Sequence, residues 1–214
     1  MKIGIDFDNT IINYGQLFHK YAIERFGMPQ ETKPDKSAIR SYFWSLPEGN
    51  AKWTELQGII YGEKILEAVP AEGIYRFLSL CKDRDIAVCI ISHKSEFPAL
   101  GPEVNLRDAA LEWLTANDFF NESHYALPRS SVFFESTRKL KVMRIGQEKC
   151  AVFIDDLPEV FEEDIFPVDV IKILYSQIEH SNAKANVIVC EDWKLIENLI
   201  IEKSKSYKQG HIDD

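Results

Sequence analysis

The sequence contains no long apolar run. Its longest hydrophobic stretches fall far short of the roughly 20 residues that a membrane-spanning helix needs. The first residues also lack the basic, apolar and small-residue segments that make up a secretory signal peptide. We therefore expect a cytoplasmic protein without a membrane partner.

Cysteine and positive charge are both scarce. The four cysteines are scattered without a CxxC pair, and the five histidines have no zinc-ligand spacing. This favours free thiols in a reducing compartment over a disulfide scaffold or a zinc site. With 25 Lys and Arg against 34 Asp and Glu, the formal net charge is −9, which disfavours a nucleic-acid partner.

The chain does have, at its very start, a short apolar run that ends in acid. Residues 3–7 are too few for a helix and rich in β-branched side chains, so they predict a buried strand. Asp6 and Asp8 lie at its end. Two ionised carboxylates about 4 Å apart repel by roughly 4 kcal/mol at an effective dielectric near 20. A hard divalent cation would offset this repulsion, and the plain alternative is an Asx turn that closes the strand.

Strands and helices alternate along most of the chain. The further expected strands are 86–91, 131–134, 151–154, 168–174 and 187–189, the last two as edge strands. The expected helices outside the first 70 residues are 70–82, 106–117, 137–146 and 191–201. The alternation predicts an α/β fold, a Rossmann-like parallel sheet flanked by helices. In such sheets the carboxyl ends of the strands meet at the edge that binds ligands.

One segment interrupts the alternation. Residues 13–69 contain helical, aromatic-rich patterns broken at 47–50, and no strand-like run. We interpret 13–69 as a helical cap inserted after the first strand. Residues 1–12 and 70–203 then form the α/β core, and 204–214 form a polar tail.

Further polar residues follow two other expected strands. Ser92 precedes His93 and Lys94, so a hydroxyl lies beside two groups that can be cationic, which suits phosphate. Asp155 and Asp156 end the strand at 151–154. Together with the first acidic pair and one lysine, these residues predict a Mg²⁺ site that handles a phosphoryl group.

The lysine has two candidates on the helix expected at 137–146, Lys139 and Lys141. Residues two apart on a helix point to nearly opposite faces, so only one of them reaches the site. Choosing Lys141 places Val142 and Ile145 on the core side, and we favour it.

Four short motifs, in this order, resemble those of the haloacid dehalogenase (HAD) superfamily. They are Asp6-Phe7-Asp8-Asn9-Thr10, Ile90-Ile91-Ser92, a Lys near a helix start, and Phe153-Ile154-Asp155-Asp156. The motifs span residues 3–158, and the insertion at 13–69 matches the superfamily's helical C1-type cap.

The resemblance implies a role for each residue. Asp6 would be the nucleophile that forms an aspartyl-phosphate, and Asp8 the general acid and then the general base. Ser92 would hydrogen-bond the phosphoryl oxygens, and Lys141 would neutralise Asp6 and the phosphate.

The resemblance also implies a metal site. Mg²⁺ would bind Asp6, the Asp8 carbonyl and Asp156, with Asp155 beside it. The other polar residues that follow the first two of these strand ends, Asn9, Thr10, His93 and Lys94, are expected to contact the substrate.

The sequence therefore predicts Mg²⁺-dependent hydrolysis of a small phosphomonoester, with a phosphorylated metabolite as the partner. Two alternatives are phosphotransfer to a sugar hydroxyl, as in the family's mutases, and a non-catalytic binding module. The presence of both Asp6 and Asp8 argues against the binding module. The pattern leaves the substrate, the pathway and the oligomeric state open.

Overall fold

The computed structural model describes residues 1–122, 125, 127–176 and 186–209, the last four of these by their backbone only. The chain forms two compact units. The first, called here the sheet unit, comprises Met1–Ile11, Ala71–His93 and Asp118–Asp214. The second, called the helical unit, comprises Ile12–Pro70 and Lys94–Asn117.

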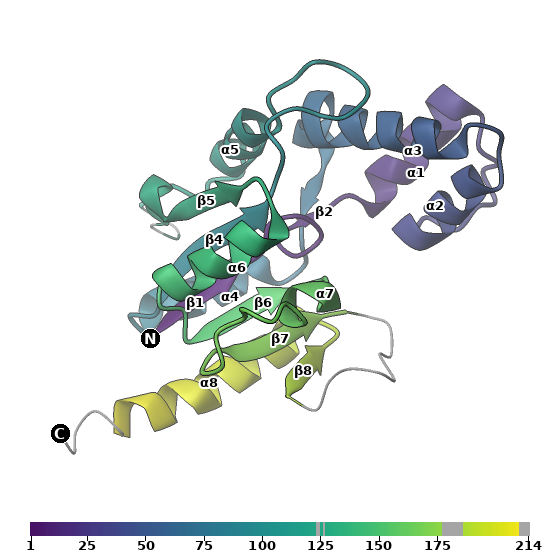
Figure 1. Ribbon diagram of the computed structural model, residues 1–214. Coiled ribbons are helices and arrows are strands. Elements are labelled where there is room, and N and C mark those ends of the chain that lie inside the picture. Colours follow the sequence, from purple (N-terminus) through teal and green to yellow (C-terminus); the bar gives the residue numbers. More distant parts are fainter. Residues whose placement is uncertain (123–124, 126, 177–185, 210–214) are drawn as a thin grey trace. The chain divides into compact units, whose positions relative to one another are not determined.

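The sheet unit is built on a parallel sheet, which has six strands within the described residues (Figure 1). Their order is β5 (Val132–Glu135), β4 (Ala87–His93), β1 (Lys2–Ile5), β6 (Val152–Asp155), β7 (Ile171–Tyr175) and β8 (Val187–Cys190). Each neighbouring pair is parallel. This confirms the predicted α/β fold class. The chain's first strand lies between β4 and β6, so the residues that follow these three strands emerge side by side.

The order of the strands in the sheet corrects the expected edge position of one strand. β7 is an inner strand, paired with both β6 and β8, whereas the strands at the ends of the described sheet are β5 and β8. The strand around Lys172 was expected at an edge. An inner position accommodates this lysine because its ammonium donates to the carbonyl oxygen of Phe161 at 3.1 Å.

Helices cover both faces of the sheet. α6 (Arg138–Gln147) lies on one face, and α4 (Ile74–Asp83) and α8 (Trp193–Gln209) lie on the other (Figure 1). The rings of Phe77 and Trp193 join the latter two helices with centroids 4.8 Å apart. The short helical segments are η3 (Arg129–Ser131) and α7 (Pro158–Phe161). The polar tail was expected from residue 204, but helix α8 continues to Gln209, and residues 210–214 lie outside the described part.

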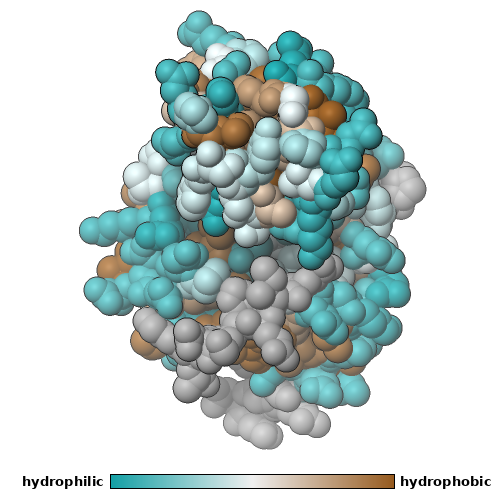
Figure 2. Space-filling model, turned by 90° about the vertical axis from the view of Figure 1, so that its right-hand side faces the viewer, coloured by the Kyte–Doolittle hydropathy of each residue, from teal (hydrophilic) through white to brown (hydrophobic). Residues whose placement is uncertain are grey.

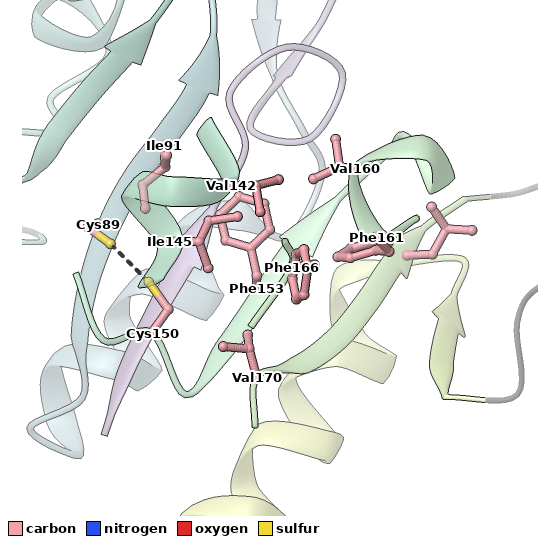
Figure 3. Close-up of a cluster of buried hydrophobic side chains, with 11 residues drawn as sticks. Cys89, Ile91, Val142, Ile145, Cys150, Phe153, Val160, Phe161, Phe166 and Val170 are labelled. Atoms are coloured by element: carbon pink, nitrogen blue, oxygen red, sulfur yellow. Dashed lines mark hydrogen bonds between the residues drawn. The ribbon is translucent and has the colours of Figure 1, made fainter. Parts of the chain in front are cut away.

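A buried cluster fixes α6 against the sheet. Val142 and Ile145 of α6 pack over Ile91 of β4 and Phe153 of β6 (Figure 3). All four side chains are fully buried. Because these positions face the sheet, the orientation of α6 around its own axis is determined by core packing.

The helical unit contains the expected run of helices. They are α1 (Gly15–Phe26), α2 (Lys36–Trp44), α3 (Gly49–Gly58), the π-helix η1 (Ile59–Glu63), the 3₁₀ turn η2 (Ile65–Glu67) and α5 (Leu106–Ala116). An antiparallel ladder of two-residue strands, β2 (Ile12–Asn13) and β3 (Val69–Pro70), closes the insertion where it begins and ends. These strands were not expected from the sequence, because two residues are too few to show an alternating pattern.

Residues 94–117 group with this insertion, although the sequence analysis placed them in the α/β core. The indole N–H of Trp113 in α5 donates to the carbonyl oxygen of Ala68 at 2.9 Å. Gly58 at the end of α3 lies against the backbone of Leu100. The contacts of α5 with η1 and η2, rather than its place in the sequence, assign it to the helical unit.

No helix in the described part of the chain is both long and apolar enough to cross a membrane. The face drawn in Figure 2 carries hydrophilic residues over much of its area, with smaller groups of hydrophobic residues between them. This agrees with a charged-residue content of 28%.

Two helical glycines provide a matched test of the packing between α3 and residue 100. A Cβ at Gly58 would lie 2.1 Å from the carbonyl oxygen of Leu100, whereas one at Gly146 in α6 would meet its nearest atom at 3.4 Å. We expect Gly58→Ala to lower the free energy of unfolding by about 1–3 kcal/mol, because a backbone atom must move. Gly146→Ala should raise it by about 0.5–1 kcal/mol through helix propensity. Urea denaturation measures both, and equal shifts would contradict this packing.

Candidate active site

Two neighbouring strands deliver the acidic residues to one point. Asp6 directly follows β1, and its N–H donates to the carbonyl oxygen of Ile154 in β6 at 2.9 Å. Asp155 ends β6, and Asp156 follows it. One carboxylate oxygen from each of the three residues lies within 4.8 Å of the others. The parallel pairing of β1 with β6 therefore produces the acidic cluster that the sequence predicts.

A lysine from α6 completes this cluster. The ammonium of Lys141 lies 2.5 Å from Oδ1 of Asp6 and 2.6 Å from Oδ2 of Asp155. It retains only 2% of its side-chain surface. Lys139, by contrast, is exposed. Because Val142 packs against the sheet, the face of α6 that carries Lys141 points toward the strand ends. The structure therefore places Lys141, and not Lys139, beside Asp6.

Two local hydrogen bonds hold these side chains in place. The Thr137 hydroxyl caps α6 by accepting from the N–H of Leu140 at 3.1 Å. Oδ1 of Asp155 accepts from the N–H of Leu157 at 3.0 Å, an Asx-type turn after β6. The contribution of the Leu157 N–H was not expected from the sequence. The signal was available in the run of two Asp before Leu157, because Asp commonly bonds the backbone two residues on.

The charges in this cluster do not balance. Three carboxylates face one ammonium in a largely buried space. Burial, with a smaller contribution from the charge of Asp6, raises the pKa of Asp155 to about 7, against the opposing effect of the nearby Lys141. For Lys141, burial alone would lower the pKa, but the carboxylates of Asp155 and Asp6 outweigh it and hold the pKa above its usual value. Additional positive charge would therefore stabilise the cluster.

The donor set fits a hard divalent cation. The three residues offer only oxygen ligands, and hard cations such as Mg²⁺ and Ca²⁺ prefer carboxylate oxygen. Asp6 and Asp155 already share Lys141, whereas Asp156 is partly exposed. Within the described residues, the side chain of Asp8 is not part of this cluster. That placement leaves open the predicted contact through its backbone carbonyl.

The loop after β1 makes a tight turn. Asn9 adopts φ 59°, a left-handed conformation that Asn tolerates better than most residues. The N–H of Ile11 then donates to the carbonyl oxygen of Phe7 at 3.1 Å. Thr10 is fully buried, and its hydroxyl has no hydrogen-bond partner among the described residues. A buried hydroxyl without a partner is costly, so this group has capacity for a bound ligand or a water.

The remaining predicted residues fall in different places. Ser92 lies near the end of β4, is 1% exposed and sits opposite Phe134 of β5. His93 is exposed, with Nε2 3.2 Å from the carbonyl oxygen of Ser136. Lys94 belongs to the helical unit, where its buried ammonium lies 5.2 Å from the centroid of the Tyr61 ring. The sheet unit by itself thus brings together Asp6, Lys141, Asp155 and Asp156.

Comparison with solved structures identifies the fold. One match is a predicted phosphatase from Clostridium acetobutylicum, with 18% identity, a TM-score of 0.57, and coverage of 94% of this chain and 98% of that one. Another is a HAD family hydrolase from Deinococcus radiodurans R1 with bound phosphate and sodium, with 11% identity, a TM-score of 0.57, and coverage of 95% and 96%. A HAD-superfamily hydrolase from Geobacter sulfurreducens matches with 15% identity, a TM-score of 0.53, and coverage of 92% and 95%. The chain has the HAD fold.

The sequence itself finds no match among protein-family models and no significant match among curated proteins. At 11–18% identity, the structural likeness establishes the HAD fold and nothing finer. It confirms the fold expected from the four motifs. The chemistry has to be argued from the side chains of this chain.

The central ion pairs make a direct prediction about stability. Lys141→Met would leave Asp6 and Asp155 facing one another without the ammonium. We expect it to lower the free energy of unfolding by about 3–5 kcal/mol in the presence of a chelator, the scale for breaking a buried ion pair from one side. Lys139→Met is the matched control and should change it by less than about 0.5 kcal/mol. Similar values for both variants in urea denaturation would show that Lys141 does not hold the cluster together.

Proposed function

We propose that this protein is a Mg²⁺-dependent phosphomonoester hydrolase that acts on a small phosphorylated metabolite in the cytoplasm. The observation that carries the proposal is the buried Lys141, 2.5 Å from Asp6 and 2.6 Å from Asp155, in a HAD fold. Phosphoryl transfer depends mainly on positioning and on neutralising charge. A carboxylate can approach a phosphate dianion only where positive charge offsets their repulsion, and Lys141 lies where it would do so.

The first chemical step is assigned to Asp6. Its carboxylate oxygen attacks phosphorus, the ester P–O bond breaks, and an aspartyl-phosphate forms. Asp8 gives a proton to the departing alcohol. The position of Asp8, two residues after Asp6 and directly before the turn at Asn9, supports this assignment.

The second step returns the protein to its starting state. Asp8, now deprotonated, takes a proton from water, and the water oxygen attacks phosphorus. The bond between Asp6 and phosphorus breaks, which releases inorganic phosphate. Ser92 would donate to a phosphoryl oxygen, and Lys141 would pair with Asp6 whenever the carboxylate is free.

The metal belongs to the same proposal. Mg²⁺ would be held by Asp6, Asp156 and the carbonyl of Asp8, with Asp155 beside it. When bound, it supplies charge neutralisation to the phosphoryl oxygens. The excess of carboxylate over ammonium supports a divalent ion in this position. Asn9, Thr10, His93 and Lys94 are proposed to contact the substrate, and the buried hydroxyl of Thr10 has the capacity to do so.

The nucleophile can be tested by Asp6→Asn. We expect the hydrolysis of p-nitrophenyl phosphate and of a panel of sugar phosphates to fall by about a thousandfold or more, because an amide cannot attack phosphorus. The fold should persist, since Lys141 keeps its ion pair with Asp155. Release of inorganic phosphate, with and without Mg²⁺, is the measurement, and circular dichroism checks the fold.

Asp83→Asn is the matched control, because Asp83 is an exposed aspartate in α4. It should retain full activity. Phosphate release by Asp6→Asn close to the unmodified rate would remove Asp6 as the nucleophile. No release by the unmodified protein from any ester would favour a binding module, and transfer to an added sugar without free phosphate would favour a mutase.

The metal ligands make a separate prediction. Both oxygens of Asp155 already have partners, the Leu157 N–H and Lys141, whereas Asp156 is partly exposed. We therefore expect Asp156→Asn to weaken Mg²⁺ binding by roughly tenfold or more, and Asp155→Asn to weaken it less. Isothermal titration calorimetry compares them, with exposed Glu159→Gln as the control. A larger loss in Asp155→Asn would reverse the assignment.

A further inference from the structure

Two thiols that the proposed reaction does not use lie in contact inside the sheet unit. The Sγ atoms of Cys89 and Cys150 are 3.7 Å apart, and both side chains are buried (Figure 3). Cys89 lies within β4, and Cys150 lies just before β6. The two residues are 61 positions apart in sequence, so only the tertiary fold brings them together.

The thiols meet over the central strand at a glycine. Gly4 of β1 is paired with Cys89 on one side and with Phe153 on the other. A Cβ at residue 4 would lie 2.9 Å from Sγ of Cys150 and 2.6 Å from the Phe153 ring. The absence of a side chain at Gly4 therefore creates the space in which two sulfur atoms from either side of β1 reach one another.

The surroundings act differently on the two thiols, and the Cys89 thiol also donates to the carbonyl oxygen of Ile3 at 3.7 Å. The hydrogen bond from Cys150 and the ammonium of Lys2 hold the pKa of Cys89 below its usual value, against the effect of burial. The bond shared with Cys89, together with burial, raises the pKa of Cys150. Lys2 forms an ion pair with Glu148. The positive charge of Lys2 lowers the pKa of both thiols, and the negative charge of Glu148 raises it.

We propose that Cys89 and Cys150 form a reversible intrachain disulfide when the protein meets a hydroperoxide. Disulfide sulfurs lie about 2 Å apart, so bond formation has to draw the two Sγ atoms together from their present separation of 3.7 Å. Cys89 is fully buried and Cys150 keeps 5% of its surface exposed, so a molecule as small as hydrogen peroxide has to reach the pair from the side of Cys150.

The chemistry balances with one peroxide. The Cys89 thiolate attacks a peroxide oxygen, the O–O bond breaks, and the departing hydroxide takes a proton to become water, which leaves a sulfenic acid. The Cys150 sulfur then attacks the sulfenic sulfur. The S–O bond breaks, and the hydroxyl leaves as water with the thiol proton of Cys150. Two electrons pass from the sulfur atoms to the peroxide, and a dithiol reductant reverses the reaction.

The test uses the full chain. The reduced protein is treated with a small excess of hydrogen peroxide, blocked with iodoacetamide in urea, and digested with trypsin. Cys89 and Cys150 fall in separate tryptic peptides, 85–94 and 150–172, each with a single cysteine. We expect two of the four thiols to be lost, these two peptides to appear cross-linked, and dithiothreitol to restore all four thiols.

Variants separate this pair from the other cysteines. Cys81→Ser and Cys190→Ser, which remove two other buried thiols, should leave the loss of two thiols unchanged. Cys89→Ser and Cys150→Ser should each abolish the cross-link. In Cys150→Ser, Cys89 should be oxidised to a sulfenic acid that dithiothreitol reduces, whereas in Cys89→Ser, Cys150 should remain a free thiol. The mapping of the unmodified protein does not depend on any variant folding.

Three results would overturn the proposal. They are four free thiols after peroxide treatment, cross-links that join other cysteines or two chains, and oxygen added to Cys89 or Cys150 without a link between them. Each can be read from the same peptide map. None depends on phosphatase activity, so this proposal and the proposed function stand or fall separately.

Discussion

The buried ammonium of Lys141, held between Asp6 and Asp155, is the interaction on which the rest of the site depends. Burying one charge costs several kcal/mol, and such a group persists only where partners meet it with good geometry. The sheet supplies that geometry, because β1 and β6 are adjacent and parallel and end at the same level. Helix α6 supplies the lysine, because the packing of Val142 in the core sets which face of the helix carries Lys141 toward the strand ends.

This arrangement connects packing with chemistry. A site with more carboxylate than ammonium in a low-dielectric space attracts a divalent cation, and that cation together with the ammonium attracts a phosphate. The order of strands decides which acids meet, and the turn at Leu157 aims one of them. The nucleophile proposed for the reaction thus owes its position to backbone pairing rather than to its own loop.

Strand β1 also makes room for the two thiols, at Gly4, which lies two residues before Asp6. Gly4 leaves the gap over β1 in which Cys89 and Cys150 meet, and Asp6 follows at the end of the same strand. One short segment of extended backbone therefore positions both the acidic cluster and the thiol pair. Its lack of a side chain at residue 4 is a packing requirement, because a Cβ there would also overlap the ring of Phe153.

The sequence by itself determined the α/β class, the position of most elements and the residues that gather at the strand ends, because apolar periodicity and Asp pairs after buried runs are local signals. Only the tertiary structure decided that Lys141 reaches Asp6, that β7 is an inner strand, and that residues 94–117 join the helical unit. The pairing of β2 with β3 and the contact between Cys89 and Cys150 could not be predicted from the sequence either. These features depend on pairings between residues far apart in the chain, and no local pattern records which distant segments pack together.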